Sequence, residues 1–377
     1  MPNHHGVKTL ETTTGTRPSA SASTAVIGIV GTAPAATSDD LPLNTPRLFT
    51  DIYAAIAAAG ATGTLANALR AIADQVNPTV VVVRVTEGAN PGATNINVIG
   101  DITTEGQKTG AKALLSAKSQ LGVTPKIIGA PGFGAQEVTA ALAVIAKQLD
   151  GFVYAPAIGE NIAEAKTYRA GFAQRELMLL WPEFSDFSGS AVARAMGLRA
   201  LIDQEVGWHK TLSNYPVQGV TGLSKGVHFD IAGVSTDASE LNDSEITALI
   251  RDGGYRFWGN RTCSDEPLFA FETAVRSGAA VREIIRESLR WAIDKPLTKW
   301  LIKDIVDTGN AALRGLVSQG YLIGAKMWYD PAKNAASALA GGKLIIDYDY
   351  TPCAPLESLT INQRITSEYY SDIPAIS

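Results

Sequence analysis

Residues that bind metals or form covalent cross-links are scarce in this sequence. Among its 377 residues are 2 cysteines and 4 histidines. They are Cys263, Cys353, His4, His5, His209 and His228. Neither residue type recurs at a metal-ligand spacing, and two distant cysteines in a chain without a secretory signal are typical of free thiols. The sequence therefore predicts no metal, no cofactor and no disulfide framework.

An excess of either charge and a long apolar run are also lacking. The chain carries 32 basic and 37 acidic residues, a net charge of −5 at pH 7. Nucleic-acid-binding proteins usually show a basic excess or a basic stripe, so no direct contact with nucleic acid is expected. The longest apolar runs, such as Val80–Val83, have the length of a strand and fall far short of the ~20 residues that span a bilayer. The N-terminus does not have the pattern of a secretory signal, so we expect no insertion into a membrane.

Hydrophobic periodicity indicates an α/β fold from residue 25 onward. The apolar content of 46% and the charged content of 18% are typical of a globular protein with a sizeable core. Buried strands are predicted at residues 25–32 and 79–85, with helices at 46–59 and 65–75 between them. The alternation continues after a Gly- and Asn-rich loop at 87–99, as in a three-layer α/β domain.

The order of these elements suggests one domain inserted into another. Residues 95–254 continue the alternation, with a short helix expected at 243–252. A strand at 256–263 is expected to return the chain to the first sheet. The core would then be built from residues 25–94 and 255–355.

Two amphipathic helices and a small sheet are predicted toward the C-terminus. Along residues 275–294, Val281, Ile285 and Leu289 recur at helical spacing. A second helix is predicted at 297–318. Two strands follow, at residues 321–329 and at 343–350, where the alternating residues are Leu344, Ile346, Tyr348 and Tyr350.

Both ends of the chain alternate apolar or β-branched residues with polar ones. The alternating residues are Val7, Thr9, Glu11 and Thr13 near the N-terminus, and Leu359, Ile361, Gln363 and Ile365 near the C-terminus. Segments of this kind bury little surface alone. They are either unstructured tails or strands that pair with an edge supplied by a partner.

Two motifs offer candidate chemistry, and each also has a structural interpretation. Gly129–Gly134 follows a strand and opens a helix, as a phosphate-binding turn does, but its spacing matches neither the dinucleotide nor the P-loop pattern. Ser190 begins a helix, as the nucleophile of subtilisin-type proteases does. A serine nucleophile needs a base, and no histidine here stands in a subtilisin-like context. We expect both motifs to be structural.

Arginines recur along one face of the first C-terminal helix. Arg282, Arg286 and Arg290 are spaced by four residues, with Glu283 and Glu287 between them. One interpretation is an exposed face with internal salt bridges, and the other is a docking stripe for an acidic partner. Both remain open at this point.

Several segments resemble the contractile-tail sheath proteins of myophages and R-type pyocins. They are His5–Ala33, Phe257–Thr262, Ser288–Ala292, Leu313–Gly320 and Leu359–Ile365. The resemblance covers nearly the whole chain. It implies an α/β (mixed α+β) fold whose core α/β domain, built from N- and C-terminal parts, carries an inserted subtilisin-like three-layer α/β domain and extended, strand-forming arms. The implied boundaries are 1–24 for the N-terminal arm, 25–94 and 255–355 for the core, 95–254 for the insertion and 356–377 for the C-terminal arm.

The resemblance implies a structural function and no enzymatic one. Subunits of this family stack as hexameric rings around an inner tail tube, and contraction drives the tube through the target envelope. The arms pair as strands with the sheets of neighbouring subunits, a contact that survives large rigid-body motion. The implied partners are further copies of the chain, the inner tail tube protein, and baseplate and tail terminator proteins. The implied location is the virion tail or a tailocin particle, assembled in the bacterial host cytoplasm.

The resemblance also implies roles for particular residues. The alternating residues of both termini would form the arm strands. The strand that receives them would contain Leu344, Ile346 and Tyr348. The candidates for contact with the tube are Arg282, Arg286, Arg290, Lys299, Lys303 and Arg314.

Other functions remain as alternatives. An α/β hydrolase would use Ser190, and a nucleotide-binding protein would use Gly129–Gly134. A type VI secretion-like sheath component is a nearer alternative. That sheath is normally made of two different chains, whereas a single chain here carries both arms and the whole core.

Overall fold

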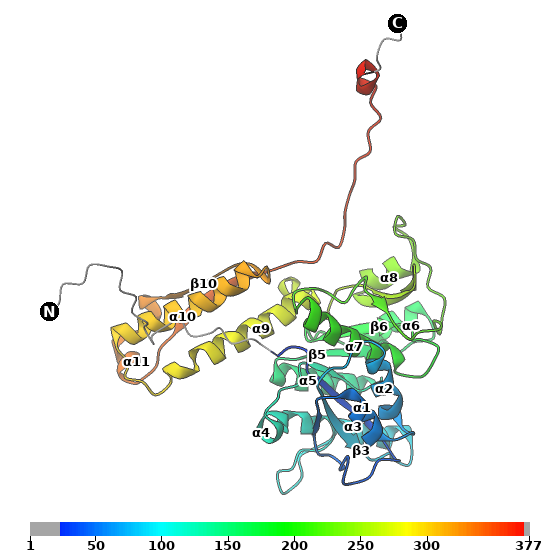
Figure 1. Ribbon diagram of the computed structural model, residues 1–377, viewed down its shortest axis with the longest axis horizontal. Helices are drawn as coiled ribbons and strands as arrows, with labels where there is room; N and C mark the ends of the chain where they lie inside the picture. Colours follow the sequence, from blue (N-terminus) through cyan, green and yellow to red (C-terminus); the bar gives the residue numbers. More distant parts are fainter. Residues whose placement is uncertain (1–22, 373–377) are drawn as a thin grey trace, which may run out of the picture.

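The structure is a computed structural model that describes residues 23–372. Figure 1 shows a large α/β body, a pair of long helices that projects from it, and an extended segment that leads away toward the C-terminus. The alternating N-terminal residues, from Val7 to Thr13, lie outside the described residues, so their role as an arm strand stays a prediction. Within the described part of the chain, no helix has both the length and the apolarity needed to cross a membrane.

One nine-stranded sheet forms the centre of the α/β body, in the order β2-β3-β1-β4-β5-β6-β8-β9-β7. Its strands are β1 (Ile27–Thr32), β2 (Arg47–Phe49), β3 (Val80–Val85), β4 (Ile127–Gly129), β5 (Phe152–Pro156), β6 (Leu177–Trp181), β7 (Pro216–Val217), β8 (Ile246–Arg251) and β9 (Tyr255–Trp258). The inner strands run parallel, and only the outer pairs are antiparallel. Parallel strands covered on both faces must be apolar along their length, and all of β3 is buried.

Helices cover both faces of this sheet. One face carries α1 (Ile52–Ala59), α2 (Thr64–Ala73) and α7 (Ser190–Glu205). The other carries α3 (Pro91–Ile99), η1 (Gly110–Ser116), α4 (Ala117–Leu121), α5 (Gln136–Leu149), α6 (Ile162–Arg169) and α8 (Asp237–Asp243). Successive residues of an extended chain face opposite sides of the sheet. Ile27 and Ile29 therefore pack under α1, α2 and α7, whereas Val26 and Val30 pack under the helices of the other face. The predicted mixed α/β fold is confirmed.

Helix α7 is buried on nearly every side, between the sheet and α2. A Cβ atom at Gly197 would lie 3.0 Å from the Cα atom of Ile72, so glycine permits the close approach of the two helices. The same helix carries Arg194 and Arg199, both buried. Buried charges need partners, so we expect these arginines to form ion pairs or hydrogen bonds between α7 and other elements.

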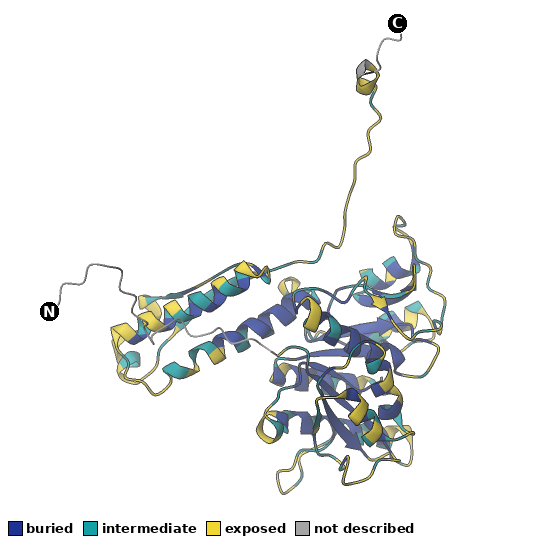
Figure 2. Ribbon diagram, in the orientation of Figure 1, coloured by how far each residue is buried: buried dark blue, intermediate teal, exposed yellow. Residues whose placement is uncertain are grey.

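The C-terminal part packs two long helices against a second sheet. Its elements are η2 (Pro267–Phe269), α9 (Glu272–Leu289), η3 (Arg290–Ala292), α10 (Lys299–Ser318), β10 (Leu322–Tyr329), η4 (Pro331–Lys333), α11 (Ala336–Ala340), β11 (Ile346–Pro352) and η5 (Glu368–Asp372). A small core of its own holds this part together, with Val281, Leu313 and Met327 among its buried residues. Figure 2 shows that the half of α9 nearer the body is buried. The two predicted helices and the strand at 321–329 are confirmed.

The connections within the large sheet differ from the expectation. Residues 246–251 form strand β8 and not a helix. Residues Ile246–Ile250 are all buried, and the segment pairs in parallel with β6. Strand β9 pairs with β8 and β7, and β4, β5, β6 and β8 separate it from β1. Strands from residues 25–94 and from 95–254 share this one sheet. The domain boundaries themselves stay predictions.

Candidate functional site

The two-stranded sheet of β10 and β11 is a candidate site because its edges are long. The strands pair antiparallel, from Leu322 opposite Pro352 to Tyr329 opposite Ile346. The outermost strands of the large sheet, by contrast, span 3 and 2 residues, and short edges offer little to an added strand. The small sheet is therefore the better acceptor for a strand from outside the molecule.

The receiving strand starts later than the sequence indicated. Ile346 and Tyr348 lie in β11, but Leu344 precedes it, so its assignment to the strand was wrong. The side chain of Asn334 is the physical reason. Its Nδ2 atom donates to the main-chain oxygen of Ile345 at 2.9 Å, and the N–H of Ile345 donates to its Oδ1 atom at 2.8 Å. These bonds hold the chain in a loop up to Ile345.

Helix α10 supports β10 through two neighbouring residues. A Cβ atom at Gly309 would lie 2.2 Å from the sulfur of Met327, so glycine makes room for this buried side chain. The side chain of Asn310 bonds both main-chain groups of Met327, at 2.8 and 2.9 Å. Strand β10 is thus fixed to α10 by packing and by hydrogen bonds.

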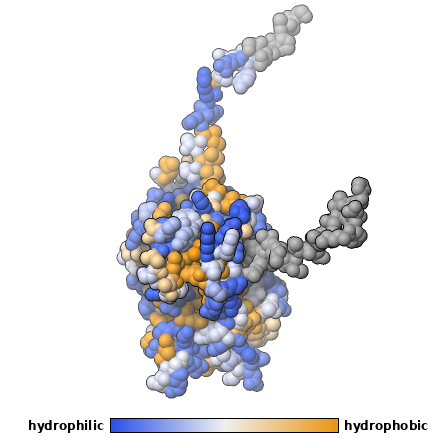
Figure 3. Space-filling view, turned by 90° about the vertical axis from the view of Figure 1, so that its left-hand side faces the viewer, coloured by the Kyte–Doolittle hydropathy of each residue, from blue (hydrophilic) through white to orange (hydrophobic). Residues whose placement is uncertain are grey.

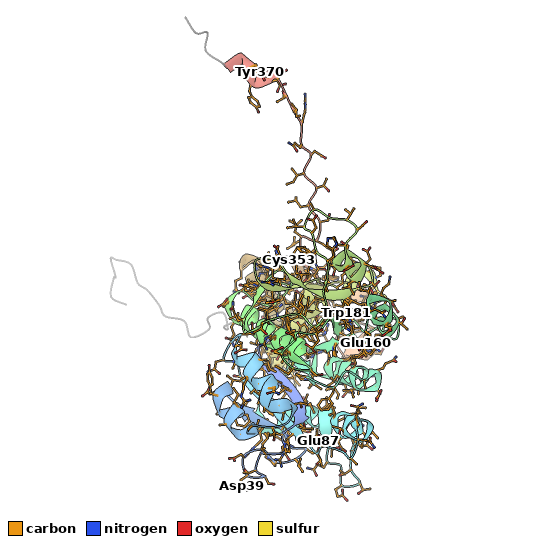
Figure 4. The ribbon with its side chains drawn as sticks, turned by 90° about the vertical axis from the view of Figure 1, so that its right-hand side faces the viewer. Asp39, Glu87, Glu160, Trp181, Cys353 and Tyr370 are labelled. Carbon is orange, nitrogen blue, oxygen red and sulfur yellow. The ribbon has the colours of Figure 1, made fainter. Side chains whose placement is uncertain are left out.

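The C-terminal segment after β11 is extended and exposed. Its apolar residues Leu359, Ile361 and Ile365 are 69%, 80% and 94% exposed. No strand occurs between residue 353 and residue 372, so the alternation at 359–365 is not matched by a partner within the described chain. Figure 4 shows the segment leading from Cys353 at the surface of the body to Tyr370 far from it. Figure 3 shows apolar side chains along its lower part.

An ion pair holds the beginning of this segment against the rest of the chain. The Nε atom of Arg261 donates to Glu357 Oε1 at 2.8 Å, and its Nη2 atom donates to Oε2 at 2.7 Å. This paired geometry restrains the direction of the carboxylate as well as its distance. Main-chain bonds on both sides of Arg261, from Thr262 to Ala270 and from Glu272 to Asn260, hold the arginine on a rigid support. The pair therefore sets where the exposed segment leaves the body.

Two of the arginines proposed to contact the tube bind the chain itself. Arg282 donates to Asp150 Oδ1 at 2.7 and 3.0 Å, and Arg286 donates to Asp150 Oδ2 at 2.5 Å. Burial alone would raise the pKa of Asp150, but the two guanidinium groups outweigh it and hold the pKa below its ordinary value. Arg290 lies 3.8 Å from Glu287. Of the pairs expected within this stripe, only Arg290 with Glu287 is present, and Asp150 at the end of α5 binds the other two arginines.

The basic residues of α10 have a different environment. Lys299, Lys303 and Arg314 are all exposed. None of them forms an ion pair with another residue of the region 23–372. Trp300, on the same helix, is 70% exposed. These side chains are available to a partner, whereas Arg282 and Arg286 are engaged.

A buried charge cluster joins the C-terminal helices to the α/β body. Arg199 Nη2 lies 2.7 Å from Asp203 Oδ1, and Arg199 Nη1 lies 3.3 Å from Glu272 Oε1. Arg276 of α9 also binds Asp203, and the hydroxyl of Tyr154 donates to Glu272 at 2.5 Å. The side chains of Arg199, Asp203 and Glu272 are 0% exposed. Helices α7 and α9 are thus held at a defined angle.

Ser190 has no access to a substrate. Its side chain is 0% exposed, whereas a nucleophile must reach the bond that it attacks. The carboxylate of Glu183 accepts hydrogen bonds from the main-chain N–H groups of Gly189 at 2.8 Å and Ala191 at 2.5 Å. The start of α7 is therefore filled by a carboxylate of the chain itself. Burial raises the pKa of Glu183, although these N–H groups act against it.

The glycine-rich turn at Gly129–Gly134 is also packed against other elements. A Cβ atom at Gly129 would lie 2.5 Å from the sulfur of Met196. The turns at Gly132 and Gly189 are in main-chain contact, since a Cβ atom at Gly189 would lie 2.1 Å from the nitrogen of Gly132. Close backbone packing explains these glycines. Across residues 23–372, no group of three or more His, Cys, Asp or Glu side chains is arranged to hold a metal.

Three features that matter for these sites were missed in the sequence. Asp150 was not recognised as the partner of the α9 arginines, because it follows α5 and only the fold brings it close. The cluster around Glu272 was missed for the same reason. Asn310 carried no signal of its own, because its partner Met327 is brought close only by the packing of α10 along β10.

Three family descriptions match the chain in succession. Residues 24–85 match the domain III N-terminal region of the tail sheath protein Gp18. Residues 106–263 match the central domain of phage tail sheath proteins, and residues 264–366 match their C-terminal domain. The matched region therefore includes the large sheet and the C-terminal helices.

Curated relatives match along nearly their whole length. The tail sheath protein of Escherichia phage P2 is 49% identical over 98% of this chain and 97% of its own. The major tail sheath protein of Serratia phage KSP20 is 45% identical over 92% of this chain and 91% of its own. These identities are high enough for the whole fold to be shared.

Solved structures of similar fold are sheath proteins as well. The helical sheath of the anti-feeding prophage in its contracted state has a TM-score of 0.73 at 18% identity, covering 96% of this chain and 98% of the other. The contracted sheath complex of an extracellular contractile injection system, PVC, has a TM-score of 0.71 at 15% identity, covering 98% and 99%. With the full-length relatives, the fold leads to one conclusion: the chain belongs to the phage tail sheath family and is a structural protein of a contractile tail, a component of the virion tail.

Proposed function

We propose that the chain stacks as hexameric rings around an inner tail tube and that contraction of the stack drives the tube through the target cell envelope. Terminal arms of each copy pair as strands with the small sheets of neighbouring copies. A solved protein of similar fold occurs in the six-fold symmetrised baseplate of the anti-feeding prophage. This similarity supports six-fold rings and contact with a baseplate at one end of the stack. A tail terminator protein would close the other end of the stack.

The observation that carries this proposal is the combination of a long acceptor edge with an exposed alternating segment. Strand β11 spans 7 residues, and within residues 23–372 it pairs on one side only. Leu359, Ile361 and Ile365 expose apolar side chains that a single copy leaves in solvent. Strand addition would bury these side chains and satisfy main-chain groups of both copies. The N-terminal arm, outside the described residues, would add to such a sheet as a further strand.

Contact with the tube is proposed for α10. Lys299, Lys303 and Arg314 are exposed, whereas Arg282 and Arg286 are bound to Asp150. A partner with an acidic surface would be attracted by the three free cations, and the attraction would weaken with salt. We therefore prefer the α10 set to the α9 set, with Arg290 the most exposed member of the latter.

Electron microscopy of the purified chain tests the assembly. We expect hollow striated cylinders from the full-length protein at high concentration, or on co-expression with its tube protein. Deletion of residues 358–377 should abolish the cylinders and leave the thermal unfolding of the monomer unchanged, because none of residues 358–372 belongs to a hydrophobic core of the described chain. Cylinders that persist without the C-terminal segment would contradict strand exchange by this arm.

A matched pair of triple variants tests the tube contact. Replacing Lys299, Lys303 and Arg314 with glutamine should weaken co-sedimentation with the tube protein at least tenfold. Replacing Arg282, Arg286 and Arg290 changes the net charge equally and serves as the control. A larger loss in the control than in the α10 variant would reverse the assignment.

A further inference from the structure

A side chain of α10 closes one edge of the two-stranded sheet. The Nδ2 atom of Asn310 donates to the main-chain oxygen of Met327 at 2.8 Å, and the N–H of Met327 donates to Asn310 Oδ1 at 2.9 Å. In an antiparallel pair, residues alternate between those that bond the partner strand and those whose main-chain groups point away from it. Met327 gives both groups to Asn310, so it belongs to the second kind. The outer edge of β10 is therefore capped at its middle.

The same alternation leaves the outer edge of β11 open. Tyr348 lies opposite Met327, and Ile346 and Tyr350 lie two positions to either side of it. Their main-chain groups therefore point to the outer edge of β11. Between residues 23 and 372, no side chain bonds the main chain of Tyr348 as Asn310 bonds that of Met327. Among the described residues, the outer edge of β10 is thus blocked at Met327, whereas no such bond blocks the outer edge of β11.

We infer that Asn310 makes strand addition one-sided, so that the C-terminal segment of a second copy adds along β11 and never along β10. The inference rests on the proposed function and specifies its acceptor edge. Closing an edge with a side chain is one way in which proteins prevent unwanted pairing. A sheet with two open edges would accept the C-terminal segment at either edge, and the copies would then lack a single defined connection.

The C-terminal segment fits the open edge in length and in chemistry. Leu359–Ile365 is as long as β11 and contains no proline. Its apolar residues would extend the face that Tyr348 and Tyr350 turn toward α9. Thr360, Asn362 and Arg364 would then lie on the outer face of the sheet.

The outer face of β11 carries the charge that Arg364 would meet. Asp349 is exposed there, and Asp347 lies two residues away, bound to Lys333 at 2.7 Å. Opposite charges on neighbouring strands stabilise their pairing. The second copy therefore supplies a complementary charge as well as apolar residues.

Hydrogen–deuterium exchange of the full-length protein, resolved to single amides, tests the inference. On assembly, the amides of Ile346, Tyr348 and Tyr350 should gain at least tenfold protection. The amide of Met327 is already bonded in the monomer and should change little. In Asn310→Ala monomers it should exchange about tenfold faster, since one hydrogen bond of ordinary strength is lost. Asn310→Asp retains the acceptor and should keep this protection.

The outcomes separate the inference from the proposed function. Protection gained at Ala325 and Tyr329 with none at Tyr348 would overturn the inference and leave strand exchange standing. Assembly without added protection on either strand would refute strand exchange itself. Asn310→Ala should also produce irregular or laterally joined cylinders, and regular cylinders with only β11 protected in this variant would show that Asn310 does not select the edge.

Discussion

Neutralising one carboxylate of the buried charge cluster should destabilise the monomer strongly. Asp203→Asn keeps the shape of the side chain and removes one negative charge from a site that is 0% exposed. The cluster holds two guanidinium groups, of Arg199 and Arg276, and two carboxylates, of Asp203 and Glu272. The variant leaves an excess positive charge where no water can solvate it.

The magnitude follows from the burial of the cluster. Breaking a buried ion pair by removing one partner costs about 3–5 kcal/mol, because the other charge is left uncompensated. A chain of 377 residues unfolds with an entropy of about 0.8 kcal/mol per kelvin, at roughly 2.1 cal/mol/K per residue. The expected decrease in Tm is therefore about 4–6 °C.

Circular dichroism during heating of the monomer measures this change. The double variant Asp203→Asn/Arg276→Gln restores charge balance and should recover part of the loss, since neutral replacements of buried pairs are often tolerated. Asp101→Asn is the matched control. It breaks an ion pair with Lys112 in which Asp101 is 89% exposed, and its Tm should stay unchanged. A decrease below 1 °C for Asp203→Asn would refute the reasoning that the cluster is dry and charge-balanced.

Three further predictions concern the C-terminal part. Gly309→Ala should lower the free energy of unfolding by about 1–3 kcal/mol, because the added methyl group would clash with Met327. Gly315→Ala, which has open space around its Cβ, should raise it by about 0.5–1 kcal/mol, and thermal unfolding measures both changes. The pKa of Asp150 lies below its ordinary value, so its ion pairs contribute fully to stability above about pH 4, and this contribution is lost as the pH falls through the folded-state pKa. Asp150→Asn should therefore lower the free energy of unfolding in urea by about 1 kcal/mol at pH 7 and by much less near pH 3. An equal decrease at both pH values would contradict the ion pair. Arg261→Gln should leave Tm unchanged, because its pair with Glu357 is partly exposed, yet widen the distance distribution between spin labels on the C-terminal segment and the body.

The sequence by itself determined the elements that local periodicity encodes. The amphipathic pattern along α9 and α10 and the apolar runs of β1 and β3 fix these elements, because burial of one face or of a whole strand is the dominant local requirement. The error at residues 246–251 has the same origin. A short apolar run such as Ile246–Ile250 fits a buried strand or a buried helix, and only its neighbours in the sheet decide between them. The resemblance to sheath proteins, carried by short segments across the chain, was likewise readable in the sequence.

Only the tertiary structure decided which charged groups are free and which edge is open. The arginines of α9 form a regular stripe in the sequence, yet Asp150 binds two of them because the fold brings the end of α5 to α9. Asn310 and Met327 are 17 positions apart, and their hydrogen bonds exist because α10 packs along β10. Contacts of this kind depend on the relative placement of whole elements. Local sequence patterns do not encode that placement, because it follows from the packing of the complete core.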